Sequence, residues 1–126
     1  MEQTVHDKVN QYRTEHQLPP LTLDPRISEQ ARIHSRAMAS GKVPVGHAGF
    51  GQRTRNLLKI ISLRHVAENA TYNQGYTVPE QQAVHDWIES TGHRVNLKGR
   101  YNLTGIGVVR NDVGEYYFTQ IFVASL

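Results

Sequence analysis

In the last part of the chain the apolar residues change from helical spacing to strict alternation, and this change constrains the fold more than any other feature. Residues 104–110 and 115–124 alternate and are rich in valine, isoleucine, tyrosine and phenylalanine, with the turn-forming segment Asn111-Asp112-Val113-Gly114 between them, which predicts a β-hairpin. The second strand is largely apolar on both faces, which carry Tyr116, Phe118, Gln120 and Phe122 on one side and Tyr117, Thr119, Ile121 and Val123 on the other. Such a sheet needs helices above and below it, so we predict an α+β fold: a three-layer α-β-α sandwich with a central antiparallel sheet.

Two amphipathic helices are predicted in the first third of the chain. Apolar residues recur at helical spacing from Val5 onwards, and this helix should end near Gln17, because the prolines that follow cannot continue it. Asp24-Pro25 has the form of an N-cap followed by proline at the first helical position. We expect the second helix to end at Gly41, which can adopt the left-handed cap.

The middle of the chain predicts a long loop, a short strand and a third helix. Residues 42–56 are rich in glycine and lack an apolar period, apart from a helical turn expected near 52–58. Residues 60–66 are β-prone and predict a strand, with Glu68-Asn69-Ala70 following at its end. Thr77-Val78-Pro79-Glu80 matches a capping box, which predicts the start of a third helix.

Length and composition limit the possible classes of protein. A chain of 126 residues has the size of one domain, which we place at 1–126. It has no cysteine, so disulfides and thiolate metal ligands are excluded. The balance of 14 Lys+Arg against 11 Asp+Glu gives a net charge of +3, and the basic residues are dispersed, so we expect no nucleic-acid partner. No apolar run approaches the roughly 18 residues of a membrane span, and no signal-peptide pattern is present.

Two of the seven histidines have surroundings that favour a functional role. His47 lies between glycines in Gly46-His47-Ala48-Gly49, and His93 follows the expected end of a helix, so the backbone can aim both rings. We hypothesise that His47, Glu68 and His93 converge in one cleft. His34 lies on an apolar helical face, where we expect a hydrogen-bonded histidine beneath the site.

A series of seven motifs runs through the chain, at residues 9–13, 18–24, 46–49, 67–70, 87–97, 105–108 and 117–122. In their order and spacing these motifs resemble the CAP superfamily, which contains cysteine-rich secretory proteins, antigen 5 and plant pathogenesis-related proteins and is also called the SCP-like domain. The disulfide-free bacterial branch is the most similar. Each motif alone is weak, but together they cover nearly the whole chain.

The resemblance implies an α-β-α sandwich and a large cleft, which in eukaryotic members carries a tetrad of two histidines and two glutamates. By motif matching, His47, Glu68 and His93 correspond to three members of that tetrad. The fourth position is Ser90 here, as is usual in the bacterial branch, so the carboxylate pair is incomplete. The resemblance also implies an exported protein, extracellular or periplasmic, whose signal peptide is absent from this sequence.

The main functional hypothesis is a binding domain for an extracellular ligand, which would be a peptide, a glycan or a lipid-like molecule. Candidate ligand contacts are Ser90, Asn69, Asn96 and Tyr72. Two imidazoles and a carboxylate also suit zinc or another divalent cation, so His47, His93 and Glu68 are candidate metal ligands. We expect the protein to be a monomer.

Two alternatives use the same residues. A bound metal would support hydrolysis of the peptidase type, with Glu68, His93 and Ser90 as candidate catalytic residues; a metal-free variant would use Ser90 as nucleophile and His93 as base. In the second alternative, His47, Glu68 and His93 form a buried hydrogen-bonded network that ties the 42–56 loop to the helices and binds nothing.

Overall fold

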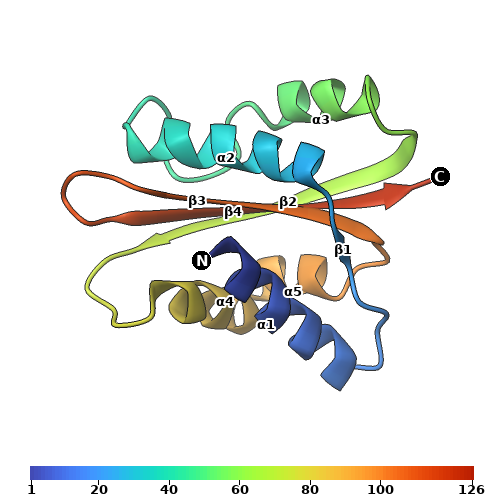
Figure 1. The fold of residues 1–126 in the computed structure, drawn as a ribbon, viewed down its shortest axis with the longest axis horizontal. Helices are drawn as coiled ribbons and strands as arrows, with labels where there is room; N and C mark the ends of the chain where they lie inside the picture. Colours follow the sequence, from blue (N-terminus) through green and yellow to red (C-terminus); the bar gives the residue numbers. More distant parts are fainter.

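Helices cover both faces of a four-stranded sheet in the structure, a computed structural model that describes residues 1–126 (Figure 1). Along the chain the elements are α1 (Glu2–Glu15), β1 (Thr22–Leu23), α2 (Pro25–Ala39), α3 (Phe50–Leu58), β2 (Leu63–Asn73), α4 (Pro79–Glu89), α5 (Thr91–Leu97), β3 (Leu103–Arg110) and β4 (Tyr116–Ser125). The predicted α-β-α sandwich is confirmed. None of the helices combines the length and apolar character that crossing a lipid bilayer requires.

The strands are ordered β1-β3-β4-β2, so β2 forms one edge of the sheet. The predicted hairpin is β3 and β4, which pair antiparallel, and β2 pairs antiparallel with the other side of β4. The two-residue strand β1 pairs parallel with the start of β3, which the sequence did not predict. The central sheet is otherwise antiparallel, as expected.

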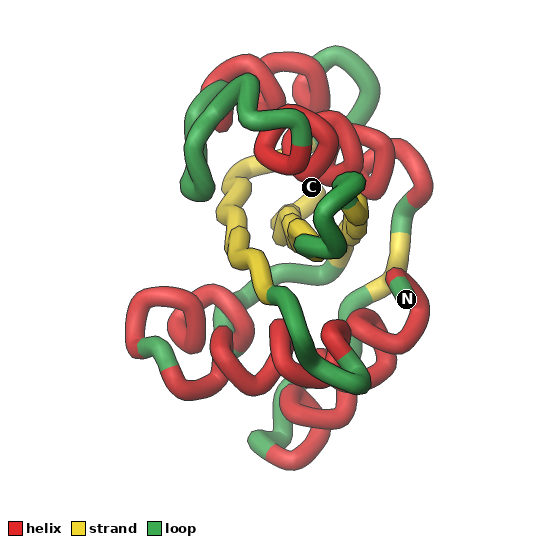
Figure 2. Tube along the Cα trace, turned by 90° about the vertical axis from the view of Figure 1, so that its left-hand side faces the viewer, coloured by secondary structure: helices red, strands yellow, loops and turns green.

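The two faces of β4 pack against different helical layers, as the alternating pattern predicted. Phe118 and Phe122 join α1, α4 and α5 in one cluster, with Trp87 fully buried at its centre. Ile121 and Val123 join α2 and α3 in a second cluster. Figure 2 shows the strands between these two groups of helices.

Two glycines allow α2 to lie directly on the sheet. A Cβ atom added to Gly105 of β3 would collide with the backbone of Ile27 and Ser28, and one added to Gly107 would collide with the backbone of Arg32. The short distance between helix and strand also lets Ser28 Oγ accept a hydrogen bond from the backbone N–H of Ile106 at 3.1 Å. The two glycines of β3 therefore set the position of α2, the helix that supports the site.

Three local predictions were wrong or incomplete. The strand predicted at 60–66 is β2, which continues to Asn73, so Glu68, Asn69 and Ala70 lie inside the strand rather than after it. The capping box fails: Val78, not Thr77, is the N-cap of α4, and no side chain caps that helix. The predicted loop 42–56 ends earlier, because α3 already begins at Phe50.

Candidate functional site

The candidate site lies along β2, where the two helical layers meet the edge of the sheet. Glu68 pairs with Ile121 of β4, so its side chain faces the layer of α2 and α3. The next residue, Asn69, pairs with Gln120 and faces the layer of α4 and α5. Because alternate residues of a strand point to opposite faces, one edge strand supplies polar groups to both layers.

Glu68 is a buried carboxylate paired with a buried arginine. Its Oε2 accepts a hydrogen bond from Arg53 Nε at 2.7 Å, and its Oε1 accepts one from Arg53 Nη2 at 2.7 Å. The Glu68 side chain is 1% exposed and that of Arg53 is 7% exposed. The two-point geometry suits a guanidinium facing a carboxylate, so we assign both groups as charged.

The same carboxylate fixes the ring of His47. Glu68 Oε1 lies 2.8 Å from His47 Nδ1, and an ionised carboxylate can only accept, so Nδ1 carries the proton. In the neutral ring, the lone pair is then on Nε2. The His47 side chain is 51% exposed, so a ring that is held firmly on one side is open to solvent on the other.

Arg53 and His34 hold the backbone on both sides of His47. Arg53 Nη1 donates to the Ala48 carbonyl at 2.8 Å, and His34 Nε2 lies 2.6 Å from the Gly46 carbonyl, to which it donates. His34 is buried as predicted, and burial is the main cause that lowers its pKa. It is therefore neutral at pH 7, and its 4.0 Å approach to Glu68 is not an ion pair.

His93 reaches β2 from the opposite layer. Its Nδ1 lies 2.8 Å from Ser90 Oγ, and the ring lies near the backbone of Ala70. Burial is the main cause that lowers the pKa of His93, and the proximity of His47 lowers it further, while the backbone of Ala70 raises it. The two imidazoles therefore lie within electrostatic range of each other, although no hydrogen bond links His93 to His47 or Glu68.

Ser90 connects α4 and α5. It is the C-cap of α4 and the N-cap of α5, but its hydroxyl makes no capping bond to the backbone of α5 and instead contacts His93. Ser90 thus orients the His93 ring. The geometry that the metal-free hydrolytic variant requires, a serine hydroxyl beside an imidazole, is present.

Asn69 and Asn96, predicted as ligand contacts, join β2 to α5. Asn69 Nδ2 donates to the His93 carbonyl at 3.1 Å, and Asn96 Nδ2 donates to Asn69 Oδ1 at 2.9 Å. Asn69 is fully buried, so it positions the His93 segment instead of facing a ligand. Tyr72, the remaining candidate, is exposed and stacks on Tyr117 with ring centroids 5.4 Å apart.

A pocket of about 240 Å³ opens beside the His47 ring. It lies between the start of α3 and β2, and its lining consists of His47, Phe50, Val66, Ala67 and Glu68. This hollow is smaller than the roughly 300–1,000 Å³ of most small-molecule sites, so it has room for one side chain beside a fixed polar group.

The structure does not arrange His47, Glu68 and His93 as a three-ligand metal set. It contains no group of three or more histidine, cysteine or carboxylate side chains positioned to hold an ion. The physical reason is Arg53, which occupies both oxygens of Glu68. The donors left for a cation are the two imidazoles, and metal binding remains a prediction.

Arg53 is the residue of this site that sequence analysis missed, because it was grouped with the dispersed surface cations. One signal was available. Arg53 and Leu57 are four residues apart and form the buried side of α3, so this arginine lies on an apolar helical face, where a charge requires a partner.

Comparison with known proteins gives the family. The sequence profile of the cysteine-rich secretory protein family, CAP, matches residues 6–122. No curated protein sequence matches the chain significantly.

Solved structures share the fold. An outer surface protein from Borrelia burgdorferi has a TM-score of 0.83 at 15% identity, and the match covers 98% of this chain and 92% of that one. An extracellular SCP-domain protein from Bacillus anthracis has a TM-score of 0.79 at 25% identity, with coverage of 98% and 40%. A cysteine-rich secretory protein from Staphylococcus aureus has a TM-score of 0.72 at 24% identity, with coverage of 97% and 37%.

This chain therefore spans less than half of the last two proteins but nearly all of the first. The family profile covers almost the whole sequence, and its members among the solved structures have the same sandwich. The chain belongs to the cysteine-rich secretory protein (CAP) family.

Proposed function

We propose that this chain is an extracellular binding domain that holds a peptide along the outer edge of β2, beside His47. The observation that carries the proposal is the His47 ring, which Glu68 fixes through Nδ1 while about half of the side chain is exposed beside a pocket. A polar group that is already oriented loses little conformational entropy when it binds a ligand. The extracellular location is supported by the family and by the extracellular protein from Bacillus anthracis.

A peptide fits this place better than a glycan or a lipid because β2 is an edge strand. Edge strands leave one row of backbone N–H and C=O groups unpaired, and an extended peptide can hydrogen bond to that row. On β2, α5 already uses part of the row, since Asn96 donates to the Glu68 carbonyl at 3.3 Å and the His93 ring lies near the Ala70 backbone. We therefore place the peptide toward Val66, where the pocket can receive one side chain.

Selection of peptides from a phage-displayed random library against the folded chain tests this proposal. Peptides that bind the parent should bind His47→Ala at least about tenfold more weakly, because the variant loses a fixed hydrogen-bonding group. His85→Ala is the matched control, since His85 is exposed on α4 and makes no hydrogen bond. Peptides that bind parent and His47→Ala equally would contradict the proposal, as would binding confined to glycans or lipid vesicles.

A divalent cation such as zinc is the second candidate, and it is favoured by the hydrogen bond between His47 and Glu68. A carboxylate on Nδ1 fixes the tautomer of a histidine and raises the basicity of Nε2, which is the arrangement behind many metal-ligating histidines. With His47 and His93 as the available ligands, affinity should be modest. Zinc should raise the Tm of the parent at pH 7.5 but not that of His47→Ala, and the rise should vanish at pH 5.5, where imidazoles protonate.

Metal-dependent hydrolysis has less support than binding. It needs a carboxylate that is free to act as a base, and Arg53 holds both oxygens of Glu68. The metal-free variant retains the contact between Ser90 and His93. Labelling of the parent, but not of Ser90→Ala, by a fluorophosphonate probe would establish a reactive serine.

A further inference from the structure

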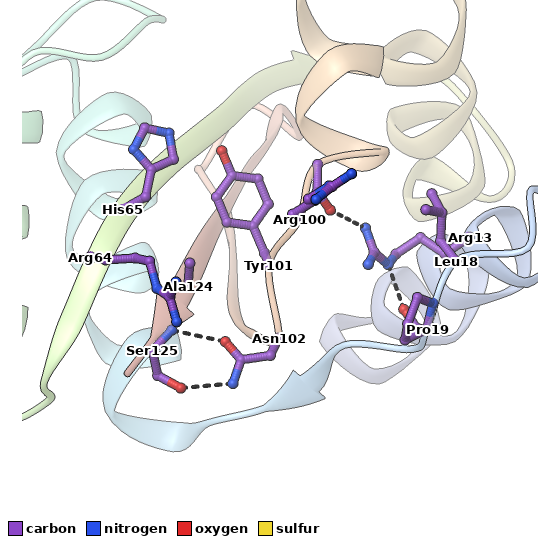
Figure 3. A pocket seen from close by; sticks show the side chains of 11 residues that line it. Arg13, Leu18, Pro19, Arg64, His65, Arg100, Tyr101, Asn102, Ala124 and Ser125 are labelled. Carbon is purple, nitrogen blue, oxygen red and sulfur yellow. Dashed lines mark hydrogen bonds between the residues drawn. The ribbon is translucent and has the colours of Figure 1, made fainter.

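A second pocket, of about 750 Å³, lies on the side of the sheet that faces α1 (Figure 3). Its walls come from the connection after α1, the start of β2, the connection between α5 and β3, and the end of β4. Three arginines and one histidine line it, and no aspartate or glutamate does. A concave surface with charges of one sign concentrates counter-ions, so this composition points to an anionic ligand.

Arg13 is the central observation. The residue is only 1% exposed, yet it has no carboxylate partner. Its Nε donates to the Pro19 carbonyl at 2.9 Å, and its Nη1 donates to the carbonyls of Leu97 and Gly99 at 3.0 and 2.9 Å. Nη2 has no hydrogen-bond partner in the protein, and because the residue is only 1% exposed, an anion could reach this nitrogen only through a small opening. Figure 3 shows this guanidinium at the wall of the pocket.

A buried charge without a counter-charge is unfavourable in free energy, and the Arg13 guanidinium is such a charge. Burial lowers the pKa of Arg13, and no nearby carboxylate raises it again. Three backbone carbonyls stabilise the guanidinium only in part, because they carry no full negative charge. An anion that contacts Nη2 would supply the missing charge.

The other cationic groups of the pocket are also free of acidic partners. Arg64 and Arg100 are exposed, and neither they nor His65 makes an ion pair. Figure 3 shows Arg64 and His65 across the pocket from Arg13, with Tyr101 between the two walls. Several guanidinium groups from separate segments therefore border one hollow.

Tyr101 gives this hollow an aromatic wall. Its ring stacks on His65 with centroids 5.7 Å apart and packs against Phe122 at 5.6 Å. Gly99 makes room for the ring, because an added Cβ there would collide with it. Leu18 and Ala124 add apolar surface, so the pocket offers cationic groups beside an aromatic and apolar wall.

We propose that this pocket binds the phosphate group of a phosphate ester. Guanidinium groups recognise phosphate with paired hydrogen bonds, and two or more of them suit a dianion better than a monocarboxylate. The volume exceeds that of the anion alone, and the Tyr101 wall would contact the organic part of the ester. The two pockets share no lining residue, although both border the start of β2, and the phosphate proposal does not rest on peptide binding.

Isothermal titration calorimetry of the whole chain at constant ionic strength tests the proposal with three soluble probes: inorganic phosphate, glycerol 3-phosphate and acetate. Glycerol 3-phosphate should bind saturably, with a Kd of about 1 mM or tighter. The variant Arg64→Gln/Arg100→Gln should weaken this binding about tenfold or more, whereas Arg13 stays intact because its carbonyl bonds support the fold. The control Arg36→Gln/Arg55→Gln removes two exposed charges elsewhere and should change the Kd less than about twofold.

Flotation with phosphatidylcholine vesicles, with and without phosphatidylglycerol, separates the two sources of a phosphate group. Binding of glycerol 3-phosphate supports a free ester as the ligand. Binding only to the phosphatidylglycerol vesicles, lost in Arg64→Gln/Arg100→Gln, supports a lipid headgroup. Equal losses in both double variants, equal affinity for acetate and phosphate, or no binding to any probe would overturn the proposal.

Discussion

Replacing Glu68 with glutamine should destabilise the protein strongly, because it leaves Arg53 charged, buried and without a counter-charge. The carboxylate is 1% exposed and contacts Arg53 through both oxygens at 2.7 Å. Removing one partner of a buried ion pair typically costs about 3–5 kcal/mol. At roughly 3–5 °C per kcal/mol for a chain of this size, the Tm should fall by roughly 9–25 °C.

Urea unfolding measures this loss through the fluorescence of Trp87, the single tryptophan, which is fully buried in the core. A domain with about 5–15 kcal/mol of stability should remain mostly folded after the change, so the midpoint can be determined. Glu89→Gln is the matched control, because Glu89 is exposed on α4 and makes no ion pair. It should change the free energy of unfolding by less than about 0.5 kcal/mol.

A double-mutant cycle with Arg53→Met separates the ion pair from general damage to the core. If the two charges stabilise each other, the double variant should lose about 1–3 kcal/mol less than the sum of the single losses. Additive losses would refute the pairing, and so would a loss below about 1 kcal/mol in Glu68→Gln. Either result would mean that Arg53 and Glu68 do not stabilise each other in the folded protein.

Three further changes test other parts of the structure. Gly107→Ala should cost about 1–3 kcal/mol in urea unfolding, because its Cβ would collide with the α2 backbone, whereas Gly92→Ala faces open space and should cost far less. Burial lowers the pKa of His34 and of His93. The two neutral histidines therefore contribute their full stabilisation above about pH 6.5, and this contribution declines as the pH falls through the lowered pKa values. A Tm that does not fall between pH 7 and pH 5 would contradict this. An unchanged slope of Tm against pH in the His34→Gln variant would contradict it as well. Asp24→Ala should cost about 1 kcal/mol, since the Asp24 side chain accepts a hydrogen bond from the Arg26 backbone N–H at the start of α2, and unchanged thermal unfolding would show that this cap is dispensable.

The layers of the fold could be predicted because they depend on the periodicity of apolar residues along the sequence. The two faces of β4 are apolar, and the structure places helices on both, with Phe122 in one cluster and Ile121 in the other. The start of α2 could be predicted because Asp24 and Pro25 are local signals, and both act as expected. Such features depend on residues that are close together in the sequence, so they can be recognised from the sequence alone.

The errors arose where distant residues decide the local structure. Glu68 and Asn69 have the polarity of a strand end, yet β2 continues through both, because Arg53 pairs with the first and Asn96 bonds the second. Thr77 and Glu80 match a capping box, but the helix begins one residue later than that motif requires. The convergence of His47 on Glu68 was predicted, whereas the arginine that neutralises the carboxylate was not.

The position of the site on β2 has a mechanical consequence. His47 belongs to the helical layer on one side of the sheet and His93 to the layer on the other, with one strand between them. A molecule that contacts both rings would bridge the two helical layers of the sandwich. A substitution that changes the packing of either layer, such as a smaller side chain at Trp87, would then change the distance between the two rings. The affinity for that molecule would change although the substituted residue lies far from it.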